Sequence, residues 1–207
     1  VNGCVNTDDL TATVVAPSDA NAGLDIDVCI DTGTIILTGS NSPNNGLSGT
    51  GLWSGNGITS GGQYTVSTVG VYTFTYSYGT GTCLTTDDVD LTVNPLPVVD
   101  AGLDFAVCVD DTLQILIGSP LGGIWSGTGI TNATGDFNPA TAQVGVHTLT
   151  YYYLDSNGCD QIDTRDVTVN GLPVVDAGLD TNLCDQMIGV TYLGNYVGGY
   201  WSGLGMD

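Results

Sequence analysis

The chain has 207 residues, 42% of them hydrophobic, and a formal net charge of −21, since 22 acidic residues face a single arginine. This charge excludes nucleic-acid binding, which needs clustered Lys and Arg, and it disfavours anionic membrane surfaces. All the acidic residues are aspartates, lysine is absent, and His147 is the one histidine. A P-loop needs lysine, and a lone histidine cannot supply a Ser-His-Asp or Cys-His pair in every part of the chain. We therefore expect a non-enzymatic protein that requires no cofactor.

No apolar run approaches the ~20 residues of a membrane helix, so we expect no membrane insertion.

The sequence repeats itself. PLPVVDAGLD at 95–104 returns as GLPVVDAGLD at 171–180, after a step of 76 residues. A tryptophan motif follows the same step, as LWSGNGIT, IWSGTGIT and YWSGLGM, around Trp53, Trp125 and Trp201.

The repeat boundaries predict four segments. Residues 1–16 end one repeat, 17–95 and 96–171 are two whole repeats, and 172–207 open a third that is incomplete. We expect the chain to be a segment of a longer array of repeats.

Within a repeat, the residue pattern predicts β-strands only, because Thr, Val, Ile and Tyr dominate and Gly and Asn separate short runs. The PLPVVDAGLD segment is expected to form the joint and the first strand of a repeat. The clearest strand is 71–78, VYTFTYSY, matched by 146–153, with its bulky residues on one face. The last strands are expected at 88–94 and 166–170. His147 takes the position of Tyr72 on the inward face, so we expect it to be packed.

Six to eight short strands in about 76 residues are typical of a β-sandwich. We therefore predict an all-β protein of tandem immunoglobulin-like β-sandwich repeats, 76–79 residues long. One tryptophan per repeat would anchor each core, at Trp53, Trp125 and Trp201.

The motif order is xVDAGxDxxVC, GxWSGxGIT, VGVxTxTYxY, NGC and DxVTVN. This order resembles the immunoglobulin-like, PKD-type repeats of giant cell-surface proteins of Bacteroidota, such as gliding-motility adhesins and other type IX-secreted proteins. The resemblance covers essentially the whole chain. It implies a tandem β-sandwich stalk outside the cell, on the surface or secreted, and it does not fix a ligand.

Six cysteines without a metal-type C-x-x-C pair indicate disulfides and an oxidising compartment. They form two classes with spacings of 79 and 76 residues. First-class cysteines follow the xAGLD segment: Cys29, Cys108 and Cys184. Second-class cysteines stand in NGC or GTC, and two of them follow the Tyr-rich strands 71–78 and 146–153: Cys4, Cys83 and Cys159.

The eleven residues 98–108 span roughly 36 Å when extended, about the length of a repeat. The two classes would then lie at opposite poles, whereas a disulfide needs Cα atoms within ~7 Å. We therefore prefer the inter-repeat pair Cys29–Cys159, with Cys83, Cys108, Cys4 and Cys184 pairing outside this segment. The intra-repeat pairs Cys29–Cys83 and Cys108–Cys159 stay open as the alternative.

The aspartates around the joints between repeats have two interpretations. They form a solvated acidic surface, or carboxylates from the linker and a neighbouring loop converge on calcium. No D-x-D-x-D-G loop is present. The candidate calcium ligands are Asp100, Asp104, Asp155, Asp160 and Asp163.

Two patterns mark modification sites. Asn132 begins an N-glycosylation sequon, and Thr112 lies in an Asp-Thr-Leu sequence that resembles the O-glycosylation pattern of Bacteroidota.

Pro95, Pro97 and Pro173 restrict the backbone between repeats. They predict short linkers that fix the angle of each repeat to the next.

Together these features predict a structural stalk segment of an extracellular adhesin or surface filament. Its expected partners are neighbouring repeats of the same chain, other copies in a filament, and an unidentified surface or glycan. The alternative is a binding module that recognises a glycan or protein through its loops or the WSGxG segment. An exposed tryptophan would favour that alternative, and a buried one favours the stalk.

Overall fold

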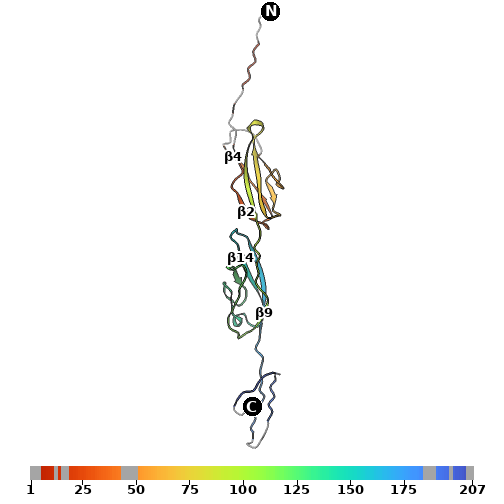
Figure 1. Ribbon diagram of the computed structural model, residues 1–207, viewed down its shortest axis with the longest axis vertical. Helices are drawn as coiled ribbons and strands as arrows, with labels where there is room; N and C mark the ends of the chain where they lie inside the picture. The colour runs from red at the N-terminus through yellow and green to blue at the C-terminus, as the bar shows by residue number, and fades with distance from the viewer. Residues whose placement is uncertain are drawn as a thin grey trace, which may run out of the picture. The chain divides into compact units, whose positions relative to one another are not determined.

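The computed structural model describes residues 6–11, 14, 19–42, 51–183, 190–195 and 198–203. Nearly all of the regular structure is β, which confirms the predicted fold class. Its strands form two sets, one within 19–94 and one within 105–170, which we call the first and the second repeat (Figure 1). The chain divides into two compact units whose bounds cut through the second set: 1–101, 118–124 and 151–163 in one, and 102–117, 125–150 and 164–207 in the other.

The first set has eight strands and one short 3-10 helix in its described residues. They are β1 (Asp19–Asn21), β2 (Ile26–Cys29), β3 (Thr34–Ile36), β4 (Ser40–Ser42), β5 (Leu52–Ser54), β6 (Gln63–Thr65), β7 (Gly70–Tyr78), η1 (Gly81–Cys83) and β8 (Thr85–Asn94). The main sheet has the order β2-β8-β7-β5, while β1 pairs with β4 and β3 pairs with β6. Only β2 and β8 run parallel in this set, with Cys29 opposite Asn94.

The second set repeats this order. It consists of β9 (Phe105–Cys108), β10 (Gln114–Ile115), β11 (Ile124–Ser126), β12 (Ile130–Asn132), β13 (Asp136–Phe137), the single-turn helix α1 (Pro139–Ala142), β14 (Gly145–Leu154) and β15 (Asp160–Asn170). Its main sheet reads β9-β15-β14-β11 and its smaller sheet reads β10-β13-β12. The parallel pair β9 and β15 corresponds to β2 and β8, with Cys108 opposite Asn170.

The core of the first set forms between the main sheet and the β3–β6 pair because the strands alternate as predicted. In β7, Phe74, Tyr76 and Tyr78 are buried on one face, whereas Val71 on the other face is exposed. Tyr64 of β6 packs on Phe74 with ring centroids 4.9 Å apart. Apolar residues of the main sheet and of the β3–β6 pair therefore meet in one layer, as in a sandwich.

The sequence placed some boundaries incorrectly. The last strands start earlier than expected, at Thr85 rather than 88 and at Asp160 rather than 166. His147 is half-buried rather than fully packed, and its Nε2 lies 2.9 Å from the carbonyl oxygen of Gln143. Tyr72 makes the equivalent bond, because its hydroxyl donates to the carbonyl of Thr68 at 3.0 Å.

The two partial repeats contain no strand in their described residues. Of 1–16, only 6–11 and 14 are described, so the expected last strand of a preceding repeat falls largely outside the described residues. In 172–207, the N–H of Asn195 donates to the carbonyl of Asp176 at 3.3 Å. The equivalent bond in the second repeat joins Ser119 to Asp100. None of the helices in the described part of the chain is long and apolar enough to cross a bilayer.

Candidate functional site

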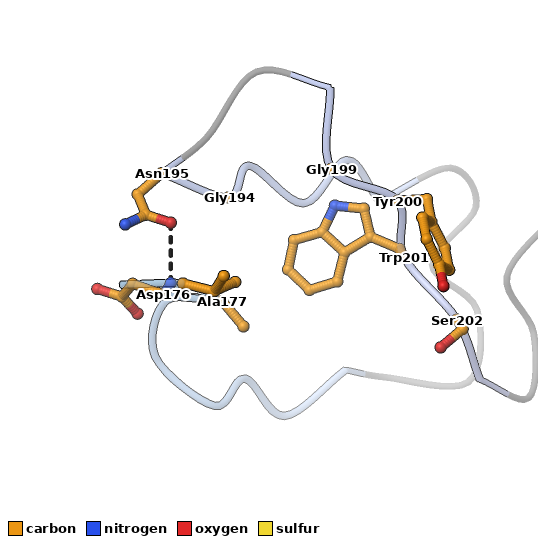
Figure 2. Close-up of a pocket in the computed structure, with 9 residues that line it drawn as sticks. Asp176, Ala177, Gly194, Asn195, Gly199, Tyr200, Trp201 and Ser202 are labelled. Atoms are coloured by element: carbon orange, nitrogen blue, oxygen red, sulfur yellow. Dashed lines mark hydrogen bonds between the residues drawn. The ribbon is translucent and has the colours of Figure 1, made fainter. Parts of the chain in front are cut away.

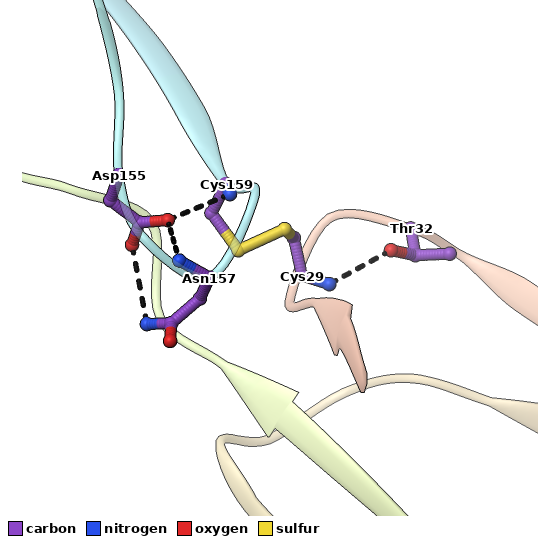
Figure 3. Close-up of a disulfide and its surroundings, with 5 residues drawn as sticks. All are labelled: Cys29, Thr32, Asp155, Asn157 and Cys159. Carbon is purple, nitrogen blue, oxygen red and sulfur yellow. Dashed lines mark hydrogen bonds between the residues drawn. A yellow bond between two sulfur atoms is a disulfide. The ribbon is translucent and has the colours of Figure 1, made fainter. Parts of the chain in front are cut away.

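A disulfide joins Cys29 to Cys159, with their Cα atoms 5.6 Å apart (Figure 3). Cys29 is the last residue of β2 in the first repeat, and Cys159 lies in the turn between β14 and β15 in the second. This is the preferred inter-repeat pair. The intra-repeat alternatives are not formed, since each would need one of these two sulfurs.

Backbone turns present both sulfurs. The N–H of Cys29 donates to Thr32 Oγ1 at 3.2 Å, and the N–H of Thr32 donates back to the carbonyl of Cys29 at 3.0 Å. On the other side, Asp155 Oδ1 accepts the N–H groups of Asn157 and Cys159, at 2.9 and 2.8 Å. Figure 3 shows the bond from Cys29 to Thr32 Oγ1 and the bonds that Asp155 accepts. An aspartate that accepts from following backbone N–H groups fixes a tight turn, and here that turn holds Cys159.

The other cysteines differ in exposure. Cys83 is half-buried and Cys108 is exposed, and both are free thiols. Cys159, by contrast, is fully buried at 0% exposure. Cys4 and Cys184 lie outside the described residues, so their pairing stays a prediction.

Aspartates of the last strand of each repeat bind the segment that precedes β2 or β9. Asp87 Oδ2 accepts the N–H of Ala22 at 2.8 Å, and Asp163 Oδ2 accepts the N–H of Ala101 at the same distance. Ala22 and Ala101 are 5% and 0% exposed. Each carboxylate therefore satisfies a buried backbone donor that would otherwise be costly.

In a second bond the roles are reversed: the segment before β2 or β9 supplies the carboxylate, and the last strand supplies the N–H. Asp104 Oδ1 accepts the N–H of Asp166 at 2.8 Å, and Asp25 does the same for Asp90 at 3.0 Å in the first repeat. The carboxylates of Asp90 and Asp166 in turn accept threonine hydroxyls of the Tyr-rich strands. These hydroxyls belong to Thr73 at 2.6 Å and Thr148 at 2.7 Å.

We call these recurring aspartate bonds the carboxylate clamps: Asp25, Asp87 and Asp90 in the first repeat, and Asp104, Asp163 and Asp166 in the second. Sequence reasoning did not identify their role. The signal that could have found them is the recurrence of each pair at the repeat step, such as Thr73 with Asp90 and Thr148 with Asp166. These hydrogen bonds are sufficient to explain why the aspartates recur, and no ligand is needed for the explanation.

The one arginine packs against the start of β9. Arg165 lies over the ring of Phe105, with its Cζ 4.6 Å from the ring centroid. Its Nη2 donates to the carbonyl of Leu103. The guanidinium thus covers the start of β9, which is a packing role as much as a charge role.

The candidate calcium ligands do not gather into a site in the part of the chain that is described. No three His, Cys, Asp or Glu side chains there lie close enough to hold a metal ion. Asp104, Asp155 and Asp163 accept backbone N–H groups, and Asp160 is exposed at the start of β15. Asp100 and Ser119 form two backbone hydrogen bonds, in which the N–H of each donates to the carbonyl of the other. Calcium binding stays the alternative to the solvated acidic surface, to be tested with chelator.

The tryptophans of the two whole repeats are core residues. Trp53 is 6% exposed and Trp125 is 2% exposed, and Trp53 packs on Tyr76 with centroids 5.1 Å apart. The glycine after WS is required for close packing. A Cβ at Gly127, whose φ is +135°, would lie 2.7 Å from Leu149 Cδ2. In these repeats the WSGxG segment therefore serves the core.

Trp201 differs, because it is 39% exposed and borders a pocket of about 330 Å³ (Figure 2). Gly194 and Gly199 also line this pocket. Their equivalents one repeat earlier are Gly118 and Gly123, where an added Cβ would collide with the ring of Tyr151.

The pocket beside Trp201 therefore corresponds to the place that a core tyrosine fills in a whole repeat. In the second repeat the Tyr151 hydroxyl accepts the N–H of Gly123 at 2.8 Å and donates to the carbonyl of Pro120. This correspondence explains the pocket by the core packing of the repeat pattern, without a ligand.

Both predicted modification residues are exposed. Asn132 ends β12, and its Oδ1 accepts the N–H of Thr134 at 3.1 Å. Thr112 lies between β9 and β10. Glycosylation at either residue stays a prediction.

No family model matches this sequence, and no curated protein matches it. Among solved structures, the PKD domain of human KIAA0319 aligns at 17% identity and a TM-score of 0.32, over 44% of this chain and 93% of that domain. Extracellular domains 3–5 of Drosophila OTK align at 11% identity and 0.38, over 71% and 59%. Human Protocadherin-24 EC1-2 aligns at 11% identity and 0.32, over 76% and 100%. The assignment of the fold rests on the strand order and burial described above.

Proposed function

We propose that this chain is a stalk segment of an extracellular adhesin or surface filament, in which tandem Ig-like repeats act as mechanical spacers. The observation that carries the proposal is the Cys29–Cys159 disulfide, which ties one repeat covalently to the next. A disulfide of this kind suits an oxidising location outside the cytoplasm. The motif order supports an origin among the surface proteins of Bacteroidota.

The disulfide changes the path that a load would take. Its cysteines are 130 positions apart, and a force applied at the two ends of the chain passes through the sulfur bond rather than through the residues between. At ~3.3–3.6 Å per extended residue, the enclosed loop holds roughly 430–470 Å of chain that cannot be drawn out. Most of both sandwiches lies in this loop, so a pulled stalk would keep its length.

The carboxylate clamps support the same role. They join the segment that precedes β2 or β9 to the last strand of the same repeat, at the edge of the main sheet where β2 pairs with β8 and β9 pairs with β15. Pro95, Pro97 and Pro173 stiffen the linkers by restricting φ. Together these features resist peeling of the strand that enters each repeat.

The alternative of a glycan- or protein-binding module has weaker support. Its candidate surfaces were the loops and the WSGxG segment; in that segment Trp53 and Trp125 are buried, and Trp201 is 39% exposed. An isolated pair of repeats that bound an immobilised glycan would favour this alternative.

The experiment that tests the proposal stretches a single oxidised chain between its termini and then repeats the stretch in reductant. A spacer held by the disulfide gives a full extension that is shorter by roughly 430–470 Å before reduction than after it. Equal extension in both conditions would show that the bond carries no load.

A further inference from the structure

We propose that Cys29 is the sulfur at which small thiols open the disulfide between the two repeats, and that the site reacts faster with thiols that carry a positive charge than with anionic ones. The product is a mixed disulfide on Cys29 beside a released Cys159 thiol. The inference concerns the chemistry of the bond itself, and it holds whether or not the chain serves as a stalk.

The two cysteines of the bond differ in their access to solvent. Cys159 is fully buried at 0% exposure, whereas Cys29 is half-buried and keeps part of its surface in contact with solvent. A thiolate must reach the sulfur that it attacks, and access is one of the factors that set the rate of exchange. Attack at Cys159 is therefore blocked while the repeats stay folded, and Cys29 is the cysteine that an incoming thiol reaches.

The turn around Cys159 maintains this difference. Asp155 binds the backbone of Cys159 twice: Oδ1 accepts the N–H of Cys159 at 2.8 Å, and the N–H of Asp155 donates to the carbonyl of Cys159 at 2.9 Å. Figure 3 shows the first of these bonds beside the disulfide. The sulfur of Cys159 therefore stays covered until this turn opens.

Carboxylates flank both ends of the bond. Asp27 and Asp31 stand two positions on either side of Cys29, while Asp160 follows the partner cysteine directly and Asp155 binds its backbone. Two extended residues span about 7 Å, which is less than the Debye length of about 10 Å at 0.1 M salt. The whole chain holds one arginine and no lysine to offset these charges. The carboxylates therefore act together on any ion that reaches the bond.

These charges oppose both thiolates of the exchange. The attacking thiolate is an anion, which the carboxylates repel, and the repulsion is weaker when the thiol also carries an ammonium group. The leaving thiolate forms at Cys159, beside the carboxylate of Asp155. Exchange depends on how readily the leaving sulfur accepts the negative charge. The bond is therefore slow to react with anionic thiols, and thiols with a cationic group are its fastest reactants.

The exchange balances without a further oxidant. The thiolate of the small thiol attacks the Cys29 sulfur, a new S–S bond forms, and the bond to Cys159 breaks. The electron pair of the broken bond stays on the Cys159 sulfur, which takes a proton from solvent. A second small thiol then attacks the first one, forms the small disulfide and releases Cys29 as a thiolate. The protein disulfide gains two electrons, and two small thiols lose them.

The test uses the full 207-residue chain with its free thiols blocked by iodoacetamide. Cysteamine, 2-mercaptoethanol and 3-mercaptopropionate give thiolates that are zwitterionic, singly anionic and doubly anionic. Each rate of opening is divided by the thiolate concentration and by the rate of the same thiol with 2-hydroxyethyl disulfide, an uncharged reference. The corrected rates should fall in that order, by about threefold or more at each step in low salt. They should converge at 1 M salt, where the Debye length is about 3 Å.

Mapping and a matched pair of variants locate the effect. Peptide mass spectrometry of acid-quenched samples should find the small thiol on Cys29 and a free thiol at Cys159. Asp155→Asn removes the charge but keeps an oxygen that accepts both N–H groups, and it should speed opening by about threefold or more. Asp88→Asn is the control, because Asp88 is exposed and lies six positions, roughly 20 Å, along β8 from Asn94, which pairs with Cys29. It should leave the rate unchanged, and melting temperatures check the folding of both variants.

Four results would overturn the proposal. The first is a small thiol attached to Cys159. The second is a set of corrected rates that ignore the charge of the thiol or the salt concentration, and the third is an equal rate for Asp155→Asn and Asp88→Asn. The fourth is a rate that does not rise with thiol concentration, because the bond would then open only after the repeats unfold.

Discussion

The backbone N–H of Ala101 donates to the carboxylate of Asp163 at 2.8 Å, although 62 residues separate them. Ala101 is completely buried, so this carboxylate is the partner that lets the chain enter the second repeat without losing a hydrogen bond. The first repeat contains the same bond between Ala22 and Asp87.

Asp163→Ala should lower the free energy of unfolding by about 1–3 kcal/mol, because it leaves a buried N–H without an acceptor. The matched control is Asp160→Ala, an exposed aspartate of the same strand, which should change it by less than about 0.5 kcal/mol. Urea denaturation followed by tryptophan fluorescence measures both. Equal effects of the two substitutions would remove the special role of the clamp.

Gly127→Ala should destabilise the second repeat by about 2 kcal/mol or more, since the new methyl group meets Leu149 and the backbone holds a positive φ. Gly122→Ala is the control, because its φ is also positive, at +96°, but nothing lies within 4 Å of the added Cβ. Only the strain of φ, about 1 kcal/mol, applies there. Thermal melting of both variants tests whether the clash adds to the strain.

Cys29→Ser should lower the free energy of unfolding by about 3–5 kcal/mol, as expected when the closure of a loop of this length is lost. Cys108→Ser changes the equivalent residue of the second repeat, which is an exposed free thiol, and should have almost no effect on the monomer. Denaturation in the absence of reductant compares them. A similar loss in both variants would mean that the residue matters for reasons other than the bond.

Chelator should leave the melting temperature unchanged, because Asp104, Asp155 and Asp163 already have backbone donors as partners. A scan with EDTA beside one with millimolar CaCl₂ makes the comparison. A melting temperature that rises with calcium and falls with EDTA would instead support the calcium hypothesis.

The sequence predicted the fold well where one local pattern sufficed. Alternation in 71–78 identified the buried face of β7, and the recurrence of WSG identified Trp53 and Trp125 as core anchors. The pairing of Cys29 with Cys159 followed from chain length, since eleven extended residues carry one cysteine class to the far end of a repeat.

The sequence failed where partners lie far apart in the chain. The clamp between Ala101 and Asp163 depends on the register of β9 and β15, which no local period reveals. The early start of β15 has a similar cause, because alternating Asp, Gln and Thr residues resemble a loop until a neighbouring strand pairs with them. Trp201 was predicted as a core anchor from its motif alone and is more exposed than Trp53 or Trp125.

The central claim is that the Cys29–Cys159 bond carries load from one repeat to the next. Single-molecule stretching of the oxidised wild-type chain, with Cys29→Ser and Cys108→Ser as paired variants, tests it most directly. The account predicts that Cys29→Ser gains roughly 430–470 Å of extension over wild type at full unfolding, while Cys108→Ser gains none. Wild-type chains that extend as far as Cys29→Ser would contradict it.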